Sequence, residues 1–156
     1  MSKTTAINIG INEKDRKKME ETGRMFQEKL NDVVRVLRDA DKLDIWRVVI
    51  GHYSGRGRTP KVVNEFVLSG NGFCSPPVLA ALKNGRVVPI DAVRSVCDAK
   101  LLYISWVYDL NFPASFRETL RNRYLDRLSA TIPMTPDIRR ALQCASDHAA
   151  RSAGGL

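Results

Sequence analysis

The stretch "RVLRDADKLDIW", residues 35–46, carries three aspartates within a segment whose apolar residues recur at helical spacing. Drawn as a helix at about 100° per residue, the segment has one broad apolar arc. That arc contains Val33, Val34, Val36, Leu37, Ala40, Leu43, Ile45 and Val48. Asp41 and Asp44 fall inside the arc, whereas Asp39 falls on the opposite, charged side. The pattern therefore predicts that Asp39 faces water and that Asp41 and Asp44 face the core.

A carboxylate on a core face needs a partner, because an unpaired buried charge costs several kcal/mol. Two interpretations are open. Asp41 and Asp44 accept hydrogen bonds from backbone amides or from buried Arg and Lys side chains, or Asp41 belongs to a polar site enclosed by the helices, such as a metal-carboxylate site.

The rest of the chain also reads as helical, and no segment alternates over more than a few residues. Its length of 156 residues and apolar content of 44% suit a single helical domain, residues 1–156. Within it, residues 1–30 are expected to be an exchanged or partner-packed arm, and residues 31–150 the helical core. Helices are predicted at 12–29, 31–52, 60–69, 76–84 and 91–110, with one or two more between 115 and 132 and a last one from Pro136, capped by Thr135. The expected fold is an all-α helical bundle.

The formal net charge of +8 predicts a surface that attracts phosphates, nucleotides or nucleic acid. The densest basic cluster is "GRGRTPK", residues 55–61. Its Arg56, Arg58 and Lys61 are candidate phosphate-binding residues, although a solvated surface loop is the simpler interpretation.

Three cysteines, Cys74, Cys97 and Cys144, lie far apart and form no CxxC pair. We expect them to be buried thiols in a reducing cytoplasm. No apolar run reaches the roughly 18 residues of a membrane span, and the N-terminus lacks the apolar core of a signal peptide. A cytoplasmic protein without a membrane partner is expected.

The segment "RDADKLDIWRVV", residues 38–49, resembles the final aspartate motif of the HD-domain metal-dependent phosphohydrolases. The stretch "LLYISWVYDLNFPASF" and the later "YLDRL" are similar to the C-terminal part of one bacterial branch of that superfamily. The resemblance covers roughly residues 30–140. It implies a fold like the C-terminal part of an HD domain, and a divalent metal, held by two histidines and two aspartates, that activates water against a phosphate ester in a phosphorylated small molecule or nucleotide.

Only Asp41 carries over, as the final metal ligand, with Arg38, Lys42 and Asp44 expected around it. The family's first histidine and its His-Asp pair lie upstream of that aspartate, and this chain has no histidine before His52. His52 lies roughly 16 Å beyond Asp41 along a helix, which is too far to share one ion. His148, in the last helix, is expected to be solvated.

The resemblance therefore implies a truncated or degenerate HD-like protein that is inactive alone. It is either the C-terminal part of a longer protein or a remnant that kept the helical scaffold. We expect the uncovered apolar face to be buried in a homo-oligomer, with the helix at 12–29 as the exchanged arm. The alternative function is a non-enzymatic basic helical module that binds nucleic acid or a protein partner.

Overall fold

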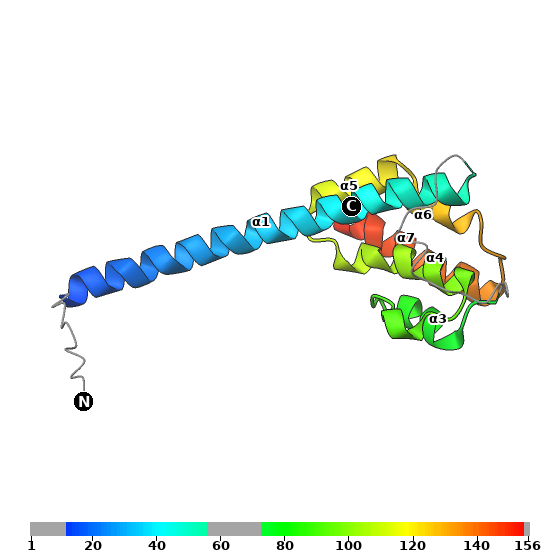
Figure 1. Cartoon of the computed structure of the whole chain (residues 1–156), viewed down its shortest axis with the longest axis horizontal. Coiled ribbons are helices and arrows are strands. Elements are labelled where there is room, and N and C mark those ends of the chain that lie inside the picture. The colour runs from blue at the N-terminus through cyan, green and yellow to red at the C-terminus, as the bar shows by residue number, and fades with distance from the viewer. Residues whose placement is uncertain (1–11, 56–72, 155–156) are drawn as a thin grey trace, which may run out of the picture. The chain divides into compact units, whose positions relative to one another are not determined.

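The computed structural model describes residues 12–55 and 73–154, which form helices and no β-strand (Figure 1). The helices are α1 (Glu13–Tyr53), α3 (Pro76–Lys83), the short 3-10 helix η1 (Ile90–Ala92), α4 (Val96–Ser105), the 3-10 helix η2 (Trp106–Asp109), α5 (Pro113–Arg121), α6 (Tyr124–Ser129) and α7 (Pro136–Ser152). The prediction of an all-α fold is confirmed. Within these two ranges, no helix has an apolar stretch that could cross a membrane.

Helix α1 joins the two helices that we predicted at 12–29 and 31–52. Gly23 weakens a helix by about 1 kcal/mol relative to Ala, yet it does not end this one. The first turn is secured by Asn12, whose side chain accepts a hydrogen bond from the Asp15 amide at 2.9 Å. The chain divides within α1 into two compact units, Met1–Arg35 and Val36–Leu156.

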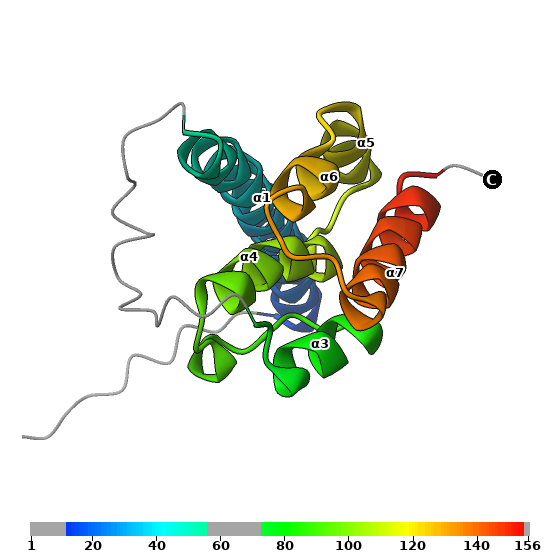
Figure 2. The same cartoon turned by 90° about the vertical axis from the view of Figure 1, so that its right-hand side faces the viewer.

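The second unit has one apolar core. Helix α7 packs against α3 and α5, and α4 packs against α3 and α6 (Figure 2). Helix α1 contributes Trp46, whose indole N–H donates to the Tyr103 carbonyl at 2.8 Å. The fully buried apolar side chains include Trp46, Val49, Ile50, Val78, Leu82, Leu101, Tyr103, Ile104, Val107 and Leu128. Burial of this set removes apolar surface from water, which is the main force that holds these helices together.

Local signals set most of the helix ends. Thr135 accepts a hydrogen bond from the Ile138 amide at 3.2 Å, which confirms the predicted start of α7. Helix α3 agrees with the predicted 76–84 to within one residue. Helix α4, however, begins at Val96 and not at residue 91, because Ser95 caps it by accepting from the Asp98 amide at 3.1 Å. The helix predicted at 60–69 lies outside the described residues.

The expectation of three free thiols was wrong for two of them. Cys74 and Cys97 form a disulfide, with their Cα atoms 5.1 Å apart. The buried carboxylate of Asp98 lies beside it and accepts from the Ser75 amide at 2.7 Å and the Ser75 hydroxyl at 2.6 Å. The segment before α3 is thus fastened to the first turn of α4. Cys144 is free and partly buried.

Candidate functional site

Helix α1 presents the opposite face to the core from the one we predicted. Asp39 is 2% exposed, whereas Asp41 and Asp44 are exposed. The predictions that Asp39 faces water and that the other two face the core were therefore wrong. The buried stripe contains Asp39, Lys42, Trp46, Val49 and Ile50. These residues follow helical spacing, and Trp46 is the largest side chain of α1. Burying Trp46 therefore contributes more to stability than burying the smaller side chains of the aliphatic arc.

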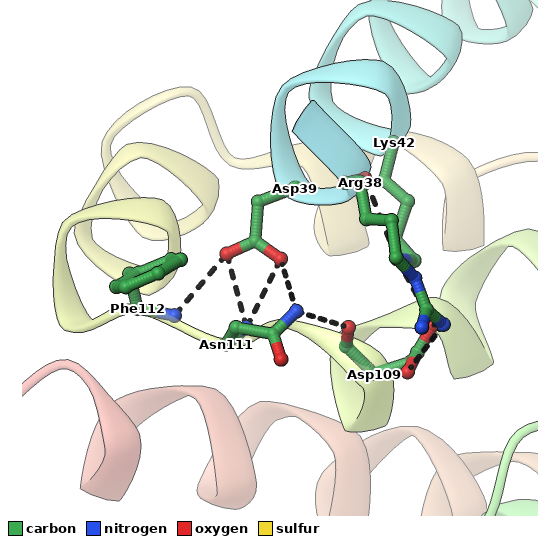
Figure 3. Close-up of polar contacts among 6 residues, drawn as sticks. All are labelled: Arg38, Asp39, Lys42, Asp109, Asn111 and Phe112. Carbon is green, nitrogen blue, oxygen red and sulfur yellow. Dashed lines mark hydrogen bonds and ion pairs between the residues drawn. The ribbon is translucent and has the colours of Figure 1, made fainter. Parts of the chain in front are cut away.

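Asp39 binds the start of α5 (Figure 3). Its carboxylate accepts from the Asn111 backbone N–H at 3.0 Å, the Asn111 side-chain amide at 2.8 Å and the Phe112 backbone N–H at 3.1 Å. Burial acts to raise the pKa of Asp39, but hydrogen bonds from Ser115, Asn111 and Phe112 outweigh it and lower the pKa below its usual value. An ionised carboxylate is well placed there, because the first amides of a helix lack partners within the helix.

Arg38 and Lys42 lie near Asp39 and bind a different acid. The Lys42 ammonium and the Arg38 guanidinium lie 2.9 Å and 2.8 Å from the same carboxylate oxygen of Asp109 (Figure 3). Lys42 is buried, so this pair is shielded from solvent on one side. Together with the Asp39 contacts, it fastens α1 to the segment between η2 and α5. The sequence indicated turn and capping roles for Asp109 and Asn111, but it could not show that their partners lie on α1.

The residues that we expected around Asp41 are therefore turned elsewhere. Arg38 and Lys42 bind Asp109, and Asp44 pairs with Arg47 at 3.2 Å. Across residues 12–55 and 73–154, no hydrogen bond or ion pair reaches the Asp41 carboxylate. The candidate phosphate-binding residues Arg56, Arg58 and Lys61 lie outside the described residues.

The donor set for a metal ion is incomplete in the part of the chain that the structure describes. No group of three or more His, Cys, Asp or Glu side chains comes together there. His52 lies in the last turn of α1 with its ring 5.2 Å from that of Tyr53. His148 lies on α7, with its ring 5.0 Å from Tyr108 and 5.6 Å from Phe116. Within residues 12–55 and 73–154, the side chains thus do not form the two-histidine, two-aspartate site that the resemblance implies.

His148 lines a polar pocket between α3, η2 and α7. The pocket is formed by Lys83, Asn84, Gly85, Tyr108, Cys144, Asp147, His148 and Arg151. Burial, and to a lesser extent the positive charge of Arg151, lower the pKa of His148. We expected a solvated histidine at this position, but the imidazole is partly buried against two aromatic rings.

His148 is expected to titrate below its usual pKa of 6.5. Because the folded protein resists protonation of this imidazole, its contribution to stability is complete above that pKa and is lost as the pH falls through the lower, folded-state value. An NMR titration of the imidazole protons measures the shift directly. Arg151→Gln should move the pKa of His148 upward by removing a neighbouring positive charge. A wild-type pKa at or above 6.5 would contradict the prediction.

We compared the chain with known proteins and found no similar one. No protein-family model, curated protein or solved structure matches the chain. The resemblance to HD-domain phosphohydrolases therefore stays a prediction, and the chemistry of the site is argued from its own residues.

Proposed function

We propose that this chain is a helical scaffold related to the HD-domain phosphohydrolases, that it does not hydrolyse phosphate esters by itself, and that it presents Asp41 to another polypeptide. The observation that carries the proposal is the surroundings of Asp41 on α1. Asp41 lies on the outward face of that helix, which we define by Leu37, Asp41 and Val48. This face is opposite to the stripe that contains Trp46.

The outward face is more apolar than a solvated helix surface requires. Leu37 and Val48 are 63% and 45% exposed. Scattered exposed aliphatic side chains are ordinary, but Leu37, one turn before Asp41, and Val48, two turns after it, share one face with this carboxylate. Such a face suits a surface that another protein covers. In an association these side chains would supply most of the apolar contact from the second unit's part of α1.

Covering this face would change the chemistry of Asp41. In water the carboxylate needs no partner, but under an apolar partner it would lose its hydration and would require a cation. That cation would be either a Lys or Arg of the partner or a divalent metal whose other ligands the partner supplies. Asp41 would then serve as one oxygen ligand, and its own chain would provide the rigid helix that holds it.

A titration with Mn²⁺ tests the role of Asp41. We expect weak binding, in the millimolar range for a single exposed carboxylate, that broadens NMR signals around residue 41 and is lost in Asp41→Asn. Asp44→Asn is the matched control, since Asp44 is also exposed and lies on the same helix but is paired with Arg47. Broadening that survives in Asp41→Asn would count against a metal-ligating role.

Hydrolysis of bis(p-nitrophenyl) phosphate in the presence of Mn²⁺ tests the second part of the proposal. We expect a rate no higher than that of Mn²⁺ alone, for the wild-type chain and for both aspartate variants. A rate well above that background that disappears in Asp41→Asn would show that the chain is active alone and would overturn this part of the proposal.

The alternative, a basic module that binds nucleic acid, is supported by the net charge of +8. Several cations of the second unit are already paired with carboxylates, among them Arg38, Lys42 and Lys83. DNA binding whose affinity falls steeply with salt, together with no effect of Mn²⁺, would favour the alternative.

A further inference from the structure

The first unit, Met1–Arg35, has an apolar seam along α1 that is separate from the outward face around Asp41. Met19, Gly23, Phe26, Leu30 and Val33 follow one another at steps of four, three, four and three residues along α1. This alternation is the heptad spacing of a coiled coil, in which every member of the seam faces the partner helix. Most of the remaining residues between Met19 and Val33 are polar or charged, including Glu20, Glu21, Arg24, Gln27, Glu28, Lys29, Asn31 and Asp32.

Every residue from Asn12 to Arg35 is exposed. Met19 and Phe26 are 62% and 70% exposed, and Leu30 and Val33 are 46% and 54% exposed. A helix in water derives most of its stability from packing of an apolar face. The local ion pairs of this segment, such as Arg35 with Asp32 at 3.6 Å, each contribute little. A partner along the seam would supply the missing packing.

The seam contains a groove beside a large side chain. The groove passes over Gly23 and is lined by Asp15, Lys18, Met19, Thr22, Gly23 and Phe26. A Cβ atom built on Gly23 would meet no atom within 4 Å, so the space is open. The Phe26 ring, one turn further along the same seam, is of a size to fill such a groove on a neighbouring helix. Large and small residues that alternate across facing positions are what tight helix packing needs.

We propose that residues 12–35 form an antiparallel two-stranded coiled coil with a second copy of this chain, in which Phe26 of each copy packs over Gly23 of the other. The two-fold symmetry of a dimer makes this exchange reciprocal, so one groove and one ring on each chain satisfy both. The inference does not rest on the function proposed above, because the seam and the Asp41 face lie in different units.

The flanking charges favour this antiparallel pairing. With Phe26 opposite Gly23, the neighbouring positions set Glu20 against Gln27 and Thr22 against Lys29 of the second copy, so no like charges meet. A parallel pairing in register would set Asp15 against Glu20, which is repulsive. The apolar side chains of two copies together offer on the order of 1,000 Å², about the lower size of a specific interface.

Sedimentation velocity on the full chain, across a wide range of concentration, measures the association. We expect a dimer for the wild type, and a dissociation constant raised about a hundredfold or more by Phe26→Glu combined with Leu30→Glu. Met25→Glu is the matched control, because Met25 is 53% exposed and apolar but lies outside the seam; its dissociation constant should stay within about twofold. A wild-type monomer at every concentration, or a seam variant that still dimerises, would overturn the proposal.

Cross-linking tests the orientation. In a Cys144→Ala background, Glu20→Cys combined with Gln27→Cys should form a covalent dimer on mild oxidation, and either substitution alone should not. Thr22→Cys combined with Gln27→Cys would instead be linked in a parallel pair, so efficient linkage in that variant would refute the antiparallel arrangement. Circular dichroism and tryptophan fluorescence of each variant verify that the second unit stays folded, since Trp46 lies in its core.

Discussion

Replacing Asp39 with Ala is expected to lower the free energy of unfolding by about 2–4 kcal/mol. The substitution removes a buried carboxylate that accepts hydrogen bonds from the backbone N–H groups of Asn111 and Phe112. These groups lie at the start of α5, where the helix supplies no acceptor of its own. Chemical denaturation followed by tryptophan fluorescence measures the loss.

Asp41→Ala is the control for this prediction, since Asp41 lies two residues further along the same helix and is exposed. Its effect should stay within about 0.5 kcal/mol. The opposite order, a large loss for Asp41→Ala and a small one for Asp39→Ala, would show that α1 buries the aliphatic face in solution. It would also restore the orientation that periodicity alone predicts.

Acidification should act on the same carboxylate. The folded-state pKa of Asp39 is lowered from its usual 3.8, so its contribution to stability is complete above that value and is lost as the pH falls through the folded-state pKa. The wild type should therefore lose more stability than Asp39→Ala as the pH is lowered below about 4. Denaturation curves for the two proteins at a series of pH values measure this difference directly.

Reduction of the disulfide between Cys74 and Cys97 is expected to lower the free energy of unfolding by about 3 kcal/mol. The bond closes a loop across a sequence separation of 23 residues, which restricts the unfolded chain. Urea denaturation with and without dithiothreitol measures the effect. Replacing both cysteines with Ala should produce a similar loss, and dithiothreitol should then have no further effect.

Cys144→Ala serves as the control for the disulfide, because Cys144 is a free thiol on α7. This variant should keep the full sensitivity of the wild type to dithiothreitol. Identical denaturation curves for the wild type with and without the reductant would contradict the prediction. That result would mean that the contacts of Asp98 with Ser75 hold the segment before α3 without help from the covalent bond.

The helical class and several helix ends could be predicted because their causes are local. Thr135 before Pro136 and the two prolines that open α3 act on residues within one turn of themselves. The start of α4 was predicted wrongly because two residues that often cap helices, Asp91 and Ser95, lie close together. Ser95 is the one that caps α4, by accepting a hydrogen bond from the Asp98 amide. Residue type alone does not show which of two neighbouring capping residues begins the helix.

The orientation of α1 could not be predicted in the same way. A hydrophobic wheel identifies the face with more apolar residues, but α1 has two apolar faces, and only contacts with the other helices decide which one is buried. The tilted packing of Trp46 on Tyr124, with ring centroids 5.8 Å apart, is such a contact. The partners of Asp39 lie 72 and 73 residues away in sequence, so no local pattern could indicate them.

The two faces of α1 in the second unit also separate two kinds of mutational change. Substitutions on opposite sides of a helix that share no contacts usually have additive effects on stability. Substitutions at the exposed Leu37 or Val48 can thus accumulate while Asp39 and Trp46 continue to specify the fold. If the outward face binds another polypeptide as proposed, its binding preference is free to evolve without a matching change in the architecture of the chain.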